Sequence, residues 1–216
     1  MTTPNKVIVL DLDDTLYSEF NYLKSAYRYI AKSLSVDDEE LYELMLDKYY
    51  NDEDVFGFLT HKYNISKAAL LKSYRFHQPT IELYSGVQVF LDSYSSTSEI
   101  ALVTDGRSET QRNKLKALGL DNCFKNIIIS EEIGSEKPDK RNFEKAILNT
   151  KGDQCFYIGD NTKKDFITPN KMDWTTICLK DQGQNIHKQD FTLADEYQPQ
   201  HCFKSWSEIK DFFDKL

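Results

Sequence analysis

Residues 6–16 read KVIVLDLDDTL, and this stretch decides how the rest of the chain is interpreted. Its first half, Val7–Leu10, is a continuous apolar run of mainly β-branched residues, typical of a strand buried on both faces of a parallel sheet. Three aspartates follow: Asp11, Asp13 and Asp14. Acids at the end of such a strand lie on the edge where open α/β sheets bind ligands. Because crowded like charges cost free energy unless a cation or a chemical role compensates them, the stretch predicts both a parallel α/β fold and a site.

The composition is that of an ordinary globular protein, and it limits the classes of partner. The chain has 216 residues, of which 40% are apolar and 29% charged, so we expect one large domain or one domain with an insert. A net charge of −8 argues against nucleic acid as a partner. No apolar run approaches the roughly 20 residues of a membrane span, and no signal peptide is indicated, so we expect a cytoplasmic protein without a membrane partner. The four cysteines form no CxxC pair, which favours reduced thiols over a zinc site.

Two regions with different patterns follow the first strand. Between Tyr17 and Leu83 the apolar residues recur only at helical spacing, which predicts a helical insert. Beyond it strands alternate with helices, which implies a parallel sheet with right-handed crossovers. We therefore expect a core made of residues 1–16 and 84–216 and an insert made of residues 17–83. The downstream strands are expected at Ile100–Val103, Asn126–Ser130, Gln154–Ile158 and Thr175–Leu179, with helices at Ser108–Leu118, Lys140–Asn149, near Asp165–Met172 and at Ser205–Leu216.

Polar clusters follow four of the predicted strands. Parallel strands end on one edge of a sheet, so we expect these clusters to converge there. Carboxylate and hydroxyl oxygens suit Mg²⁺, and a carboxylate beside such an ion can attack phosphorus as a nucleophile. Each cluster alone is also explained by turn or capping chemistry, but four placements together favour a functional site. The clusters are Asp11–Thr15, Thr104–Gly106, Glu136–Pro138, and Gly159–Asp160 with Asp165.

In order and residue type these clusters resemble the four motifs of phosphatases of the haloacid dehalogenase superfamily. The resemblance implies an α/β fold with a Rossmann-like parallel sheet core and a helical-bundle cap insert. It also implies a Mg²⁺-dependent phosphatase that hydrolyses a small phosphorylated metabolite through an aspartyl-phosphate. The matching motifs are DxDxT at Asp11–Thr15, the Thr of VTDG at Thr104, the Lys of EKP at Lys137, and GDxxxxD at Asp160 and Asp165.

The resemblance further implies roles for the aspartates. Asp11 would be the nucleophile and a metal ligand. Asp13 would act as general acid and then as general base, and its backbone carbonyl would also bind the metal ion. Asp160 would complete the metal site, and Asp165 would mainly orient Asp160 or Lys137. Because Asp13 must carry a proton in the first step while Asp11 contacts the metal, we expect the pKa of Asp13 to lie well above that of Asp11.

The remaining motif residues would bind the phosphoryl group. Thr104 and the backbone amides of Asp105 and Gly106 would hold phosphate oxygens, and Lys137 would neutralise their charge and that of the nucleophile. Asp14 stands where related sequences often have glycine, and we expect it to face solvent or to cap the following turn. The catalytic set implied by the resemblance is Asp11, Asp13, Thr104 and Lys137.

The insert resembles the α-helical cap of the haloacid dehalogenase and sugar-phosphatase branch. The short interval between Thr104 and Lys137 leaves no room for a cap at the other family position. Such caps close over small substrates and exclude water, with hinges expected near Tyr17–Phe20 and Leu83–Gly86. The first residues of the insert either face the leaving group or pack within the cap. They are Tyr17, Glu19, Phe20 and Tyr22.

Other functions share part of this pattern. A phosphomutase uses the same core and is the main alternative. A dehalogenase needs no general acid, so Asp13 argues against it, whereas a phosphonate hydrolase would need a cap lysine such as Lys24 or Lys32. A phospho-acceptor receiver domain carries its acceptor aspartate after a later strand and lacks so large an insert. A catalytically silent binding protein would have little reason to hold all four motifs.

Overall fold

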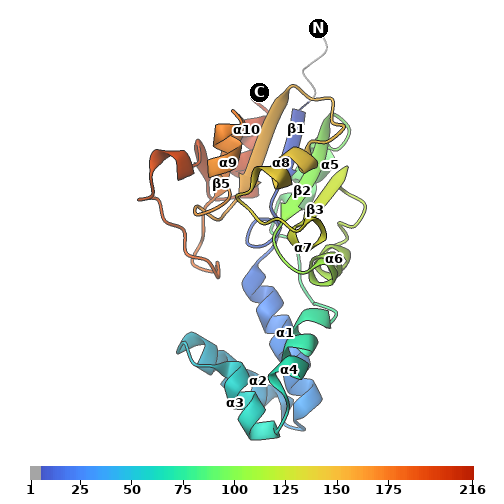
Figure 1. Ribbon diagram of the computed structural model, residues 1–216, viewed down its shortest axis with the longest axis vertical. Coiled ribbons are helices and arrows are strands. Elements are labelled where there is room, and N and C mark those ends of the chain that lie inside the picture. Colours follow the sequence, from blue (N-terminus) through green and yellow to red (C-terminus); the bar gives the residue numbers. More distant parts are fainter. Residues whose placement is uncertain (1–5) are drawn as a thin grey trace.

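The computed structural model describes residues 6–216, so residues 1–5 of the predicted core lie outside the described part of the chain. A sheet flanked by helices forms one part of the molecule, and a lobe of helices extends from one end of it (Figure 1). The strands form a single parallel sheet in the order β3-β2-β1-β4-β5-β6. Their bounds are β1 Lys6–Leu10, β2 Ser98–Thr104, β3 Asn126–Ile129, β4 Gln154–Gly159, β5 Thr175–Leu179 and β6 His201–Phe203.

The parallel α/β class predicted from the sequence is confirmed by this sheet. All the predicted strands are present, with ends within two residues of the expected positions. The prediction omits β6, because three half-buried residues are too short to show an alternating pattern. It also places Ser130 at the end of a strand, whereas Ser130 begins the short helix α7.

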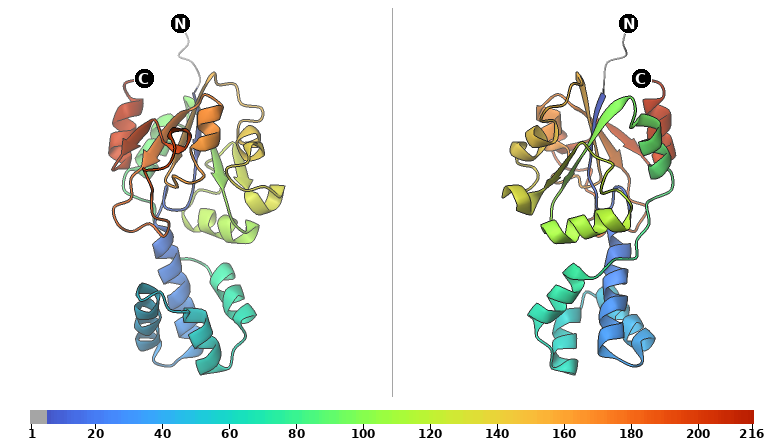
Figure 2. Two further views of the ribbon diagram at one scale, coloured as in Figure 1. Left: turned by 60° about the vertical axis from the view of Figure 1, so that its left-hand side comes forward. Right: turned by 90° about the vertical axis from the view of Figure 1, so that its right-hand side faces the viewer.

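Helices cover both faces of the sheet (Figure 2). Side chains alternate along a strand, so Ile8 and Leu10 of β1 pack with α5, α6 and α10, whereas Val7 and Val9 pack on the opposite face, against α8. All four of these side chains are fully buried, which explains why β1 is apolar throughout. Burial of each stabilises the fold by about 1.5–3 kcal/mol. The helices of this part are α5 Val87–Tyr94, α6 Ser108–Ala117, α7 Ser130–Ile133, α8 Lys140–Ala146, α9 Ile167–Lys171 and α10 Trp206–Phe213, with a 3₁₀ turn at Asp195–Tyr197.

The helical lobe is built from four helices that pack around an apolar core of their own. The N-terminus of α4 is capped by Ser66, whose Oγ accepts a hydrogen bond from Ala69 N at 3.2 Å. The core of the lobe includes Leu23, Ile30, Leu41, Met45, Leu59 and Leu70. The four helices are α1 Glu19–Leu34, α2 Asp38–Tyr50, α3 Val55–Tyr63 and α4 Lys67–Phe76.

The two segments that join the lobe to the sheet lie side by side. Tyr17 forms a β-bridge with Leu83, and Tyr84 N donates to Leu16 O at 2.8 Å. Tyr17 is fully buried and packs with the core of the sheet. In the described range, no helix combines the length and the apolar character required to cross a bilayer.

Candidate active site

The four predicted polar clusters meet at the carboxyl ends of β1, β2 and β4, which are adjacent in the sheet. A cavity of about 80 Å³ lies at this edge. Asp165 and Gly106 do not line it. Asp165 Oδ2 accepts a hydrogen bond from Asp160 N at 3.2 Å, and the backbone N–H of Gly106 donates to Ser130 Oγ at 2.9 Å. The lining residues are Asp11, Asp13, Asp14, Glu19, Thr104, Asp105, Lys137, Asp160, Asn161, Lys164 and His187.

Lys137 lies between two carboxylates at the bottom of the site. Its Nζ is 2.7 Å from Asp11 Oδ1 and 2.8 Å from Asp165 Oδ1, and it also donates to Tyr157 Oη at 3.2 Å. Burial alone would lower the pKa of Lys137, but the attraction of Asp11 and Asp165 outweighs it and raises that pKa well above the ordinary value. Lys137 therefore stays charged and offsets part of the negative charge around it.

A cluster of buried carboxylates forms a site that fits a divalent cation. Oxygen atoms of Asp11, Asp160 and Asp165 lie within 4.8 Å of one another. Both oxygens of Asp165 are already engaged, one with Lys137 and the other with the backbone amides of Asp160 and Asn161. Within residues 6–216, the second oxygens of Asp11 and Asp160 accept no hydrogen bond. These two residues are therefore the better candidates for ligands, and Asp165 is the residue that orients them.

The electrostatics of the cluster point to the same conclusion. Burial, followed by repulsion from Asp165, raises the pKa of Asp160 well above its usual range. Burial also raises the pKa of Asp11 to about 7, although Lys137 opposes the shift. A bound cation would relieve this penalty by favouring the ionised carboxylates.

The residue before Asp160 is a glycine because a side chain there would clash with its neighbours. A Cβ atom at this position would lie 2.5 Å from Asp165 Oδ2 and 2.9 Å from a ring carbon of Tyr157. Only glycine therefore lets the end of β4 approach the carboxylate of Asp165.

Asp13 is held by three side chains on the side of the cavity that faces the helical lobe. Lys114 Nζ lies 2.6 Å from Asp13 Oδ1, which also accepts a hydrogen bond from the Tyr17 hydroxyl. Gln111 Nε2 donates to Asp13 Oδ2 at 2.8 Å and to Thr104 Oγ1 at 2.6 Å. The general-acid candidate and the phosphate-binding candidate are thus joined through one amide group.

These contacts reverse the expected order of the pKa values. Burial would raise the pKa of Asp13, but the ion pair with Lys114 and the hydrogen bonds from Lys114, Tyr17 and Gln111 lower it below the ordinary value. The pKa of Asp11 is raised instead. The expected order assumed a cation bound to Asp11 and did not include Lys114, because a lysine inside a helix carries no sequence signal for such a pairing.

Asp14 does not face solvent, so that part of the prediction is wrong. It is 3% exposed and has a left-handed backbone conformation with φ of 53°. Its carboxylate accepts hydrogen bonds from Glu19 N at 2.8 Å and from Ile186 N at 2.9 Å. Asp14 therefore caps the start of α1, as the other part of the prediction says, and also holds the loop that follows β5.

Several residues around the cavity are absent from the sequence prediction. Lys114 and Gln111 lie three residues apart on α6, so they share one face of that helix and are both buried. The sequence does not show that this face is turned toward the site, because that depends on how α6 packs. His187 and Asn185 lie in the irregular segment after β5, where no periodicity points to the site. Asn185 Nδ2 donates to Asp160 Oδ2 at 2.8 Å.

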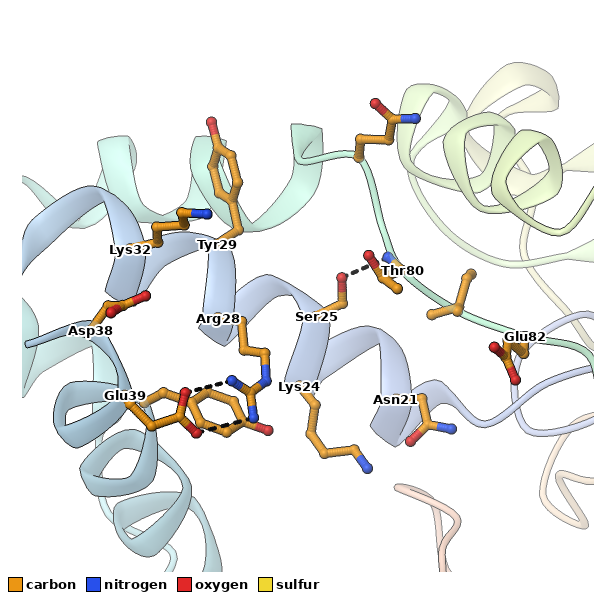
Figure 3. Close-up of a pocket in the computed structure, with 13 residues that line it drawn as sticks. Asn21, Lys24, Ser25, Arg28, Tyr29, Lys32, Asp38, Glu39, Thr80 and Glu82 are labelled. Carbon is orange, nitrogen blue, oxygen red and sulfur yellow. Dashed lines mark hydrogen bonds and ion pairs between the residues drawn. The ribbon is translucent and has the colours of Figure 1, made fainter.

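A larger groove lies elsewhere on the molecule. It has a volume of about 670 Å³ and runs along α1, where Arg28 forms two hydrogen bonds with Glu39 (Figure 3). Lys24 and Lys32 line this groove and do not line the acidic cavity. In this structure neither lysine therefore lies where a phosphonate hydrolase would require one.

The fold and the site together define an α/β core with carboxylates, a lysine and a threonine at the carboxyl edge of its sheet. The sequence profile of the haloacid dehalogenase-like hydrolases matches residues 8–179, and the chain belongs to this family. The resemblance stated from the motifs is thereby confirmed, and with it the assignment of the protein as a hydrolase.

The chain is similar over most of its length to proteins named glyceraldehyde 3-phosphate phosphatase. It is 26% identical over 204 residues to glyceraldehyde 3-phosphate phosphatase of Methanopyrus kandleri, covering 81% of this chain and 84% of that protein. It is 25% identical to the Methanocaldococcus jannaschii protein of the same name, covering 87% and 90%. A shorter match, 35% identical over 86 residues, is to phosphoserine phosphatase of Thermus thermophilus and covers 38% and 34%.

Solved structures share the whole fold. The putative HAD-hydrolase YfnB from Bacillus subtilis, bound to magnesium, has a TM-score of 0.70 at 18% identity, covering 98% of this chain and 100% of that one. The 2-haloacid dehalogenase from Pseudomonas syringae has a TM-score of 0.66 at 19% identity, covering 98% and 99%. At these identities the likeness supports the fold alone.

Proposed function

We propose that the protein is a Mg²⁺-dependent phosphatase that hydrolyses a small phosphomonoester through an aspartyl-phosphate. The observation that carries the proposal is the buried cluster of Asp11 and Asp160 close to Lys137, in which one oxygen of each carboxylate accepts no hydrogen bond from residues 6–216. Two relatives that match over most of the chain are named glyceraldehyde 3-phosphate phosphatase, and their names support the same reaction. The phosphomutase alternative has no separate observation in its favour.

The side chains divide the reaction between them. Asp11 would attack phosphorus with one carboxylate oxygen while its other oxygen faces the cation, and the bond from phosphorus to the ester oxygen would break. Asp13 is ionised in this structure, so it would first take up a proton when substrate binds. It would give that proton to the departing oxygen and then accept one from the water that hydrolyses the aspartyl-phosphate. Lys137 would stabilise charge on the phosphoryl oxygens, with Thr104 as a hydrogen-bond partner.

Asp11 and Asp160 would hold the magnesium ion, and Asp165 would keep Asp160 oriented. When bound, Mg²⁺ supplies positive charge that stabilises the phosphoryl oxygens during transfer. The role of the helical lobe as a cap belongs to the same proposal. Its first helix, α1, brings Glu19 to the cavity wall, so the lobe and the sheet both contribute residues to the site.

The Asp11→Asn variant tests the nucleophile directly. Removing the nucleophile should lower phosphate release from p-nitrophenyl phosphate by at least about a thousandfold, because catalytic groups that act as a unit fail together. Asp153→Asn is the matched control, since Asp153 is exposed and remote from the cavity. Substantial turnover by Asp11→Asn, with a fold equal to that of the control, would refute the assignment.

A further inference from the structure

We propose that the acidic cavity selects phosphomonoesters with an uncharged, hydroxyl- or carbonyl-bearing organic part, rejects those with a carboxylate, and uses Glu19 to discriminate. The inference rests on the proposed phosphatase function and specifies its substrate class. It concerns the side of the cavity that faces the helical lobe, where the leaving group of a phosphomonoester would lie beside Asp13.

Glu19 presents an acidic group to this side of the cavity. It is the first residue of α1, and its backbone N–H donates to Asp14 Oδ1 at 2.8 Å, which fixes the start of the helix there. Its side chain lines the same cavity as Asp11 and Asp13. Among the hydrogen bonds and ion pairs of residues 6–216, none involves its carboxylate. A polar group is therefore available for a substrate, and that group is an acid.

The lysines around the cavity are already bound to carboxylates. Lys114 is also buried, so releasing it to a substrate would leave Asp13 without its charged partner. The ion pairs are Lys114–Asp13 at 2.6 Å, Lys137–Asp11 at 2.7 Å and Lys164–Asp105 at 2.7 Å.

His187 does not supply the missing charge. It lines the cavity, but burial and the nearby charge of Lys164 lower its pKa, which favours the neutral imidazole. Within the described residues, no cation that lines the cavity is therefore free to receive a carboxylate of the substrate.

The pKa of Glu19 indicates how strongly the lobe side of the cavity disfavours a further negative charge. Burial, then the negative charge of Asp13, raises the pKa of Glu19 to about 8. A substrate carboxylate in the same surroundings would meet the same desolvation and repulsion. A hydroxyl avoids this cost and donates to the ionised Glu19, whereas a carbonyl oxygen accepts from the protonated form.

Two compounds that differ mainly in this group provide the test: glycerol 3-phosphate and 3-phosphoglycerate. For the unmodified enzyme with Mg²⁺, kcat/KM should be at least about tenfold higher for glycerol 3-phosphate, because an unpaired charge is disfavoured in a partly buried site. Glu19→Lys should shift the ratio of the two kcat/KM values toward 3-phosphoglycerate by at least about tenfold, since it supplies a cation. Glu43→Lys, an exposed change on α2 with the same charge difference, should leave the ratio unchanged.

The outcomes separate the inference from the proposed function. A kcat/KM for 3-phosphoglycerate that equals or exceeds that for glycerol 3-phosphate would overturn the substrate class. A ratio that Glu19→Lys does not move would overturn the role of Glu19. If Glu19→Lys does not fold, Glu19→Gln replaces it and should shift the ratio in the same direction by a smaller factor. Failure to release phosphate from both compounds and from p-nitrophenyl phosphate would instead refute the phosphatase itself.

Discussion

The two sides of the acidic cavity are built differently, although both are dominated by aspartates. On the inner side, Asp11 and Asp165 are held by Lys137, and all three belong to the sheet part of the molecule. On the side facing the lobe, Asp13 is held by Lys114, and Glu19 arrives from the first helix of the lobe. Under the proposed function, the inner side would hold the phosphoryl group and a cation, and the other side would face the leaving group. The two sides should therefore respond differently to the same kind of change.

Removal of the cation should have the largest effect. Treatment with EDTA should reduce phosphate release from p-nitrophenyl phosphate to the background rate, because Asp11 and Asp160 would then face the phosphoryl group without a positive ion. Added Mg²⁺ should restore the rate. Full activity after exhaustive chelation, measured with the metal content of the sample, would contradict the assignment of the inner side.

Removal of the cation should also change how the stability of the protein depends on pH. Asp11 has a pKa of about 7 in the cation-free fold against an ordinary 3.8, so the folded state binds more protons than the unfolded chain between these values. Its contribution should thus make the cation-free protein lose stability as the pH rises from about 4 to about 7. Stabilisation by Mg²⁺, measured as the rise in Tm, should grow over the same interval, and a rise that shrinks with pH would argue against Asp11 as a ligand.

Lys137→Met should have the next largest effect and should break the inner side. The substitution leaves Asp11 and Asp165 buried without their partner, which we expect to cost about 3–5 kcal/mol in the free energy of unfolding. Phosphate release should fall by at least about a thousandfold for every substrate, because charge neutralisation at the phosphoryl group does not depend on the leaving group. Urea unfolding and kcat/KM measure the two effects, with the exposed Lys151→Met as control.

Lys114→Met should have the smallest effect, and it should affect only the side of the cavity that faces the lobe. The change should raise the pKa of Asp13, but it also removes one of the three side chains that position the carboxylate. We expect the loss of positioning to dominate, so that kcat/KM falls by about 10–100-fold for glycerol 3-phosphate, whose leaving oxygen needs a proton. The loss should be smaller for p-nitrophenyl phosphate, which has a good leaving group. Lys116→Met, an exposed change on the same helix, is the control. An equal loss with both substrates would mean that Lys114 acts on the fold rather than through Asp13.

The sequence by itself determined the sheet apart from β6, and the inner side of the cavity. The apolar run of β1 and the acids after it required a buried parallel strand with carboxylates at its end, and the later motifs placed Thr104, Lys137 and Asp160 on the same edge. This succeeded because a parallel sheet converts the order of strands into a shared edge, whatever the loops do. It also identified a helical insert after β1, since helical periodicity is a local signal.

Only the tertiary structure decided the other side of the cavity. Lys114 and Gln111 reach Asp13 because α6 packs with one face toward the sheet edge, and Asp14 is buried because the chain turns there with a positive φ. His187 and Asn185 reach the site from the irregular segment after β5, whose sequence has no periodic pattern. Such contacts join positions far apart in the chain through the packing of helices and loops. A linear pattern records which residues a strand or helix contains, but not which of its polar residues the fold turns toward a site.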